Sequence, residues 1–133
     1  MNYLCPELKI KNINQVSILG LAHVGDGVFE LLCRTYLISL GKTALPDIHK
    51  SAVAMVNAAA QRQFSEKIMD MLNDDEMAVF KRGRNAKVNS VPKNASEADY
   101  HAATGLEALF GWLYLQGALE RINELFLAGI GDA

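Results

Sequence analysis

Asp26 is the first residue whose surroundings suggest chemistry. It lies in "LAHVGDGVFELL", residues 21–32, an apolar stretch in which a glycine stands on each side of the carboxylate. At about 100° per residue, an α-helix gathers the polar residues of this region into one narrow stripe. The stripe consists of His23, Asp26, Glu30 and Arg34. A helix that is apolar on its other sides must turn this stripe toward a polar site or toward solvent.

Spacing and glycine content allow two interpretations of the stripe. Glu30 and Arg34 are four residues apart, as in an ion pair on an exposed helix, and for Glu30 we favour that interpretation. Asp26 would then be the exposed end of the same strip. Its flanking glycines favour a site instead, because a glycine inside a helix costs about 1 kcal/mol relative to alanine. Gly25 and Gly27 therefore indicate that another segment approaches the backbone beside Asp26.

A second carboxylate, Glu107, lies in similar surroundings in "ATGLEALFGWLYL", residues 103–115. Its neighbours one turn away on the same helix face are Ala103, Thr104 and Gly111. A helix that crosses the first one through these small residues would bring Glu107 to Asp26. Two buried like charges are tolerated with a shared cation or a shared proton. Mg²⁺ suits such a pair better than Zn²⁺, since no histidine or cysteine cluster accompanies it.

Positive charge is concentrated in one segment of an otherwise acidic chain. The formal net charge is −2, yet residues 77–96 contain five basic residues and no acidic one. The basic residues are Lys81, Arg82, Arg84, Lys87 and Lys93. Such a strip is a candidate phosphate-binding surface, and on charge alone a solvated loop is an equal alternative. Glycine, proline and three asparagines predict a loop over residues 82–95, and a loop of that length is usually functional or mobile.

The elements that must hold these residues are predicted to be helices, because apolar and polar residues alternate nowhere as in a strand. The first predicted helix covers residues 15–40, and the second begins at residue 45 and includes "SAVAMVNAAA" (51–60). The third is short, is interrupted at "NDDE" (73–76) and leads into residues 76–81. The fourth covers residues 96–116, and the last one ends at residue 129. The chain has 133 residues, half of them hydrophobic. That length suffices for one domain, residues 1–133, with one core.

Cysteine usage and hydropathy favour a cytoplasmic protein. Cys5 and Cys33 show neither a disulfide pattern nor metal-ligand spacing, so we expect two free thiols. No apolar run approaches the roughly 20 residues that cross a bilayer. The apolar stretch near the N-terminus is followed at once by acidic residues and lacks a cleavage motif for export.

Together, "LAHVGDGVFELL", "RGRNAK", "PKNA" and "YHAATGLEALFGWLYL" make the chain similar to the mini-ribonuclease III family. These bacterial ribonuclease III-like enzymes consist of the catalytic domain without the double-stranded-RNA-binding domain. The resemblance covers residues 17–116 in the expected order and spacing. It implies an all-α ribonuclease III endonuclease-domain fold, assembled as a symmetric homodimer.

The resemblance also implies an activity and assigns residues to it. The activity is magnesium-dependent hydrolysis of double-stranded RNA and, in the family, maturation of the large-subunit (23S) ribosomal RNA precursor, with a ribosomal protein that presents the RNA as a further candidate partner. Asp26 matches the metal-binding aspartate of the family's "GD", and Glu107 matches the glutamate of "FEAL", here "LEAL". Both are expected to be catalytic and to bind Mg²⁺. The five basic residues, above all Lys87 and Lys93, are expected to bind RNA, chiefly by its A-form shape.

The chain departs from the pattern of full-length ribonuclease III at two positions. The larger family has an acidic residue four positions before the aspartate and three positions before the glutamate, where this chain has Ala22 and Thr104. Mini-ribonucleases typically show the same reduction. Two carboxylates then remain per site, and we expect modest metal affinity. His23 occupies a usually aromatic position at the family's dimer contact, so we expect an interface residue rather than a catalytic base.

A non-catalytic double-stranded-RNA-binding helical dimer is the main alternative, because the loss of two carboxylates would also fit a loss of chemistry. Two other helical hydrolase classes fit poorly. A nucleotide pyrophosphatase needs a second acidic residue three or four positions from Glu107, and an HD-type phosphohydrolase needs a His-Asp dipeptide. The sequence has neither.

Overall fold

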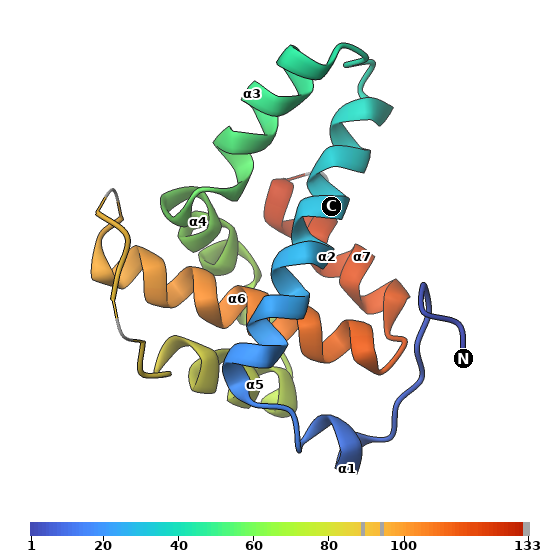
Figure 1. Ribbon diagram of the computed structural model, residues 1–133, viewed down its shortest axis with the longest axis vertical. Coiled ribbons are helices and arrows are strands. Elements are labelled where there is room, and N and C mark those ends of the chain that lie inside the picture. The colour runs from blue at the N-terminus through green and yellow to red at the C-terminus, as the bar shows by residue number, and fades with distance from the viewer. Residues whose placement is uncertain (89, 94, 132–133) are drawn as a thin grey trace.

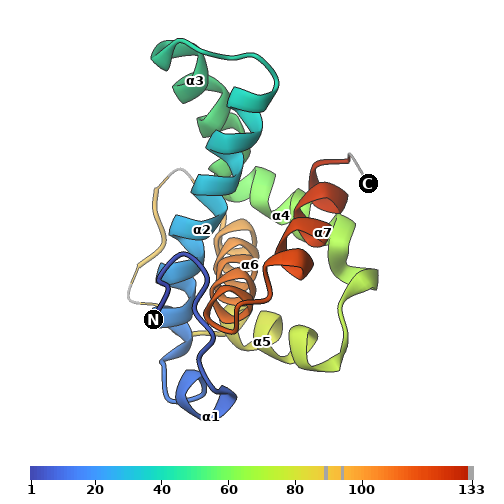
Figure 2. The same ribbon diagram turned by 90° about the vertical axis from the view of Figure 1, so that its right-hand side faces the viewer.

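Helix α6 (Glu97–Leu115) runs through the middle of the protein, and the other long helices pack around it (Figure 1). The computed structural model describes residues 1–88, 90–93 and 95–131. Turned by 90°, the molecule shows α6 enclosed by α2, α4, α5 and α7 (Figure 2). Buried residues lie on several sides of α6, from Ala102 to Leu113, which explains its nearly continuous apolar sequence. The described residues contain helices and no strand, so the all-α prediction is confirmed.

The remaining helices range from the 22-residue α2 to the four-residue α1. They are α1 (Ile10–Ile13), α2 (Ile18–Ser39), α3 (Leu45–Val56), α4 (Ala58–Ile68), the 3-10 turn η1 (Met69–Met71), α5 (Asp74–Arg84) and α7 (Leu119–Ile130). None of the described helices is long and apolar enough to cross a membrane. Cys5 and Cys33 are both free, as predicted.

The predicted second helix is divided in two at Asn57. The Asn57 side chain accepts a hydrogen bond from the backbone N–H of Ala60 at 2.9 Å and so caps the start of α4. Its amide also donates to the carbonyl oxygens of Val53 and Ala54, each at 3.1 Å, at the end of α3. The prediction of one continuous helix through residues 51–60 was therefore wrong. Helical propensity alone does not reveal such a cap, because alanine favours a helix on either side of it.

Two other boundaries differ from the predicted ones. Helix α2 begins at Ile18 rather than at residue 15, because Ser17 caps it by accepting a hydrogen bond from the N–H of Gly20 at 3.0 Å. Helix α5 continues to Arg84, so the predicted loop over residues 82–95 begins three residues later. Of that loop, residues 89 and 94 lie outside the described part of the chain.

Four phenylalanines bind the helices around the site into one core. The ring of Phe29 on α2 packs edge-on against Phe64 of α4, with 5.1 Å between centroids. It also contacts Phe110 of α6 at 5.7 Å and Phe126 of α7 at 6.2 Å. Aromatic pairs in this arrangement add to the stability that burial of their area already gives. The cluster therefore fixes α2, α4, α6 and α7 relative to one another.

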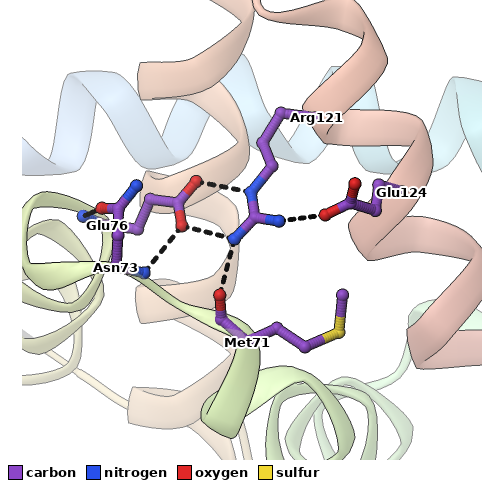
Figure 3. Close-up of polar contacts among 5 residues, drawn as sticks. All are labelled: Met71, Asn73, Glu76, Arg121 and Glu124. Carbon is purple, nitrogen blue, oxygen red and sulfur yellow. Dashed lines mark hydrogen bonds and ion pairs between the residues drawn. The ribbon is translucent and has the colours of Figure 1, made fainter.

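A buried ion pair links α5 to α7 (Figure 3). Glu76 is 2% exposed and closes a capping box with Asn73 at the start of α5. Arg121 of α7 donates to both Glu76 carboxylate oxygens, at 2.8 and 2.7 Å, and to the carbonyl oxygen of Met71 at 2.6 Å. The hydrogen bond from Arg121 lowers the pKa of Glu76. This pair holds the orientation of α5, the helix whose last turn carries three of the basic residues.

Candidate active site

The predicted crossing of the two carboxylate-bearing helices is present. A Cβ atom placed on Gly25 of α2 would stand 1.6 Å from the backbone carbonyl oxygen of Glu107, and one placed on Gly111 of α6 would stand 2.0 Å from that of Leu21. Only glycine at both positions allows the two backbones to come this close. The crossing places the Glu107 carboxyl close enough to that of Asp26 for Asp26 to raise the pKa of Glu107.

Partial burial dominates the electrostatics of Glu107. The pKa of Glu107 is raised to about 8, first by loss of solvent and then by a hydrogen bond with Asp26 and by the negative charge of Asp26. Glu30 adds a smaller effect of the same sign on the pKa of Glu107. Near neutral pH, Glu107 therefore holds a proton that a bound cation would have to displace.

Gln61 of α4 is a third side chain at the site, and sequence reasoning missed it. Its Nε2 donates to Oε2 of Glu107 at 3.5 Å, and this bond lowers the pKa of Glu107 in opposition to the other groups. Gln61 is buried with Phe64, Ser65 and Ile68 on the inner stripe of α4. The sequence did contain a signal for its burial, because Gln61 is spaced with the three other residues at i+3, i+4 and i+7, as on the buried face of a helix.

The donor set suits a hydrated Mg²⁺ ion. Ala22 and Thr104, at the positions of the larger family's additional acidic residues, are both buried, and the Thr104 hydroxyl donates to the Tyr100 carbonyl oxygen at 2.9 Å. Within residues 1–88, 90–93 and 95–131, no group of three or more histidine, cysteine, aspartate or glutamate side chains could hold a metal. Two carboxylates leave most of a magnesium coordination shell to water or substrate, which that ion commonly accepts.

The polar stripe on α2 faces outward. Asp26 is exposed within this chain and Glu107 is half-buried, so the expectation that both carboxylates are buried was wrong. Glu30 and Arg34 form the predicted ion pair at 3.3 Å. His23 and Gly27 are exposed. No atom lies within 4 Å of a Cβ built on Gly27, so the expected close approach exists at Gly25 but not, within this chain, at Gly27. The outer surface of α2 also exposes Leu19, Leu31 and Ile38.

All five predicted RNA-binding residues are exposed, but they occupy two different kinds of structure. Lys81, Arg82 and Arg84 lie in the last turn of α5, whereas Lys87 and Lys93 lie in the connection to α6. Gly83, in the same turn, packs tightly on α6: a Cβ there would stand 2.8 Å from the Cα of Gly105. This contact places the basic end of α5 against the part of α6 that precedes Glu107.

This arrangement is that of a ribonuclease III domain. Several helices enclose a central one, and two carboxylates meet where two helices cross at glycines. The model of the family described as Ribonuclease III domain matches residues 19–118. A crystal structure of a protein from Fusobacterium nucleatum superimposes with a TM-score of 0.79 at 32% sequence identity, covering 87% of this chain and 89% of that one.

Sequence relatives narrow the class. The chain is 44% identical over 124 residues to Mini-ribonuclease 3 of Clostridium tetani. The aligned region covers 92% of this chain and 82% of that protein. It is 40% identical over 118 residues to Mini-ribonuclease 3 of Enterococcus faecalis, with 87% and 89% covered. The chain belongs to the Mini-ribonuclease 3 family and is an endoribonuclease of the ribonuclease III type. The family resemblance inferred from the sequence is confirmed.

Proposed function

We propose that this chain is a magnesium-dependent endonuclease for double-stranded RNA, with Asp26 and Glu107 as its catalytic metal ligands. The observation that supports this most directly is the close crossing of α2 and α6 at Gly25 and Gly111, which places the two carboxylates near each other. Both side chains are carboxylates, the oxygen donors that Mg²⁺ prefers, and Glu107 becomes anionic when a bound ion displaces its proton. When bound, Mg²⁺ lowers the pKa of a coordinated water and stabilises charge on the phosphate that is attacked.

The remaining steps depend on the chain's own residues. In this proposal Asp26 and Glu107 supply oxygen ligands, and no side chain acts as the nucleophile. Lys81, Arg82, Arg84, Lys87 and Lys93 bind RNA phosphates. Recognition is mainly of A-form shape, because phosphates carry no sequence information. The domain would comprise residues 1–133, of which 132 and 133 lie outside the described part.

A symmetric homodimer completes the proposal. The outer surface of α2 combines exposed His23 with exposed apolar residues, Leu19, Leu31 and Ile38. A two-fold axis at this surface would bury them and place one site against each strand of a duplex. Sedimentation at working concentrations should give the mass of a dimer, and a monomer would contradict this part of the proposal.

The natural setting is proposed on family resemblance. The substrate would be the 23S ribosomal RNA precursor, cleaved in the cytoplasm, with a ribosomal protein that presents the RNA. Cells that lack the protein should then accumulate 23S precursor with unprocessed ends, and expression of the chain should restore processing.

The activity itself is tested with long double-stranded RNA and with single-stranded RNA of the same sequence, each with and without Mg²⁺. We expect cleavage only of the duplex and only with Mg²⁺. Binding of the duplex without cleavage at any Mg²⁺ concentration would favour the non-catalytic RNA-binding dimer instead. That alternative takes its support from the small number of carboxylates at the site.

A further inference from the structure

Gln61 occupies a position that the two-carboxylate site does not by itself explain. Its side chain is 4% exposed, and an amide is costly to bury unless it is hydrogen bonded. The other members of the inner stripe of α4 are Phe64, Ser65 and Ile68. An apolar residue at this position would pack in the core without that cost.

The surroundings hold Gln61 firmly in place. Asn57 fixes the start of α4 four residues earlier through bonds to backbone groups of both α3 and α4. Phe64, about one turn later, packs against Phe29 at 5.1 Å and against Phe110 at 6.0 Å between ring centroids. Helix α4 therefore cannot slide or rotate without breaking core contacts.

The amide is directed at one atom of the site. Its Nε2 donates to Oε2 of Glu107 at 3.5 Å, a long bond by the usual geometry of such contacts. Glu107 itself extends from α6, and Phe110 on the same helix packs against Phe64 as Glu107 packs against Gln61. One rigid contact between α4 and α6 thus also determines where the Glu107 carboxylate lies.

We infer that Gln61 is a positioning residue: its amide orients the Glu107 carboxylate so that Glu107 and Asp26 bind the same Mg²⁺ ion. This inference rests on the proposed function. Side chains that hold a metal ligand by a hydrogen bond typically change metal affinity or activity by roughly 10- to 100-fold when they are removed. With only two carboxylates at the site, loss of the correct orientation of one should be costly.

The test compares two substitutions on the same helix. Gln61→Leu removes the donor and keeps an apolar side chain of similar size. Gln63→Leu makes the same chemical change at an exposed position of α4 and is the matched control. For each full-length protein, Mg²⁺ affinity is measured by calorimetry without RNA, and cleavage of double-stranded RNA is measured across Mg²⁺ concentrations.

We expect Gln61→Leu to weaken Mg²⁺ binding roughly 10- to 100-fold and to raise the Mg²⁺ concentration for half-maximal cleavage by a similar factor. Gln63→Leu should match the unsubstituted protein in both measurements. Should Gln61→Leu fail to fold, Gln61→Met, which is unbranched, takes its place with the same expectation. Unchanged Mg²⁺ binding in the folded variant, or an equal loss in Gln63→Leu, would overturn the inference.

One further variant separates this inference from the proposed function. Asp26→Asn should abolish most Mg²⁺ binding whatever Gln61 does. If Asp26→Asn binds Mg²⁺ like the unsubstituted protein, the metal site is wrong and the role of Gln61 is overturned with it. If Asp26→Asn loses binding and Gln61→Leu does not, only the role of Gln61 is overturned.

Discussion

Gly25 of α2 lies against the backbone carbonyl of Glu107 with no room for a side chain between the helices. This contact sets the distance between α2 and α6, and with it how close Asp26 and Glu107 lie. The geometry of the candidate site therefore depends on Gly25, next to Asp26, and on the peptide group of Glu107.

Gly25→Ala should disrupt this crossing. Its Cβ would overlap the backbone of α6, which cannot move as a flexible side chain can, so we expect a loss of more than about 3 kcal/mol in unfolding free energy. Gly27→Ala is the matched control, because nothing lies within 4 Å of its Cβ. It should fold and gain up to about 1 kcal/mol from helix propensity. Urea denaturation of both variants decides, and similar midpoints for the two would contradict the packing described.

The ion pair between Glu76 and Arg121 predicts a loss of stability in acid. The hydrogen bond from Arg121 lowers the pKa of Glu76 below its ordinary value of 4.5, so the pair stabilises the folded state above that pH and ceases to do so as the pH falls below it. Glu76→Gln should cost on the order of 3 kcal/mol at pH 7, since it leaves a partly buried Arg121 with only the more exposed Glu124 as counter-charge. Denaturation at a series of pH values should show the difference shrinking below about pH 4. A constant difference would argue against the pair as its cause.

Glu107 predicts the opposite pH dependence for the protein in EDTA. Loss of solvent and the neighbouring Asp26 raise the pKa of Glu107 from an ordinary value of 4.5 to about 8, so its contribution to stability is most favourable below pH 4.5 and is lost as the pH rises toward 8. Glu107→Gln should therefore melt at the same temperature as the unsubstituted protein near pH 5 and at a higher temperature near pH 8. Thermal melts of both proteins test this prediction, and it fails if the difference between them does not change with pH.

Lys87 and Lys93 should contribute to RNA affinity through phosphate contacts. Replacing both with alanine should reduce the slope of log affinity against log salt by about one per lost contact and leave the fold intact. Lys9→Ala with Lys11→Ala removes the same charge from exposed positions near the N-terminus and is the control. RNA binding is titrated at several salt concentrations in magnesium-free buffer. An unchanged slope in the first variant, or the same change in the control, would exclude this segment from the RNA-binding surface.

The sequence predicted the crossing of the two carboxylate-bearing helices because it leaves local signals. Asp26 and Glu107 each interrupt an apolar helix, and small residues beside them allow a close crossing. The Glu30 and Arg34 pair follows from spacing on one helix alone. These features depend on residues within about one turn of each other, so helical periodicity is enough to find them.

Features that depend on contacts between distant segments were harder to predict. Gln61 begins the buried stripe of α4, but nothing in the sequence pairs it with Glu107 until α6 is placed against α4. Gly27 resembles Gly25 in sequence, but it lies on the side of α2 that faces away from α6. Asn57 divides two helices through bonds to backbone groups on both sides, whereas the alanines around it favour one continuous helix. For Gln61 and Gly27, tertiary packing decided between local possibilities of similar energy. The Asn57 bonds are local and compete with the continuous helix that its neighbours favour.

The central claim is that Asp26 serves catalysis at the expense of stability, and one variant tests it directly. Asp26→Asn removes one charge from two facing carboxylates, so its melting temperature in magnesium-free buffer should be unchanged or higher. Cleavage of double-stranded RNA by the same preparation should fall by orders of magnitude, because an amide is a poor ligand for Mg²⁺. A variant that melts at a lower temperature yet still cleaves at a nearly normal rate would contradict the account.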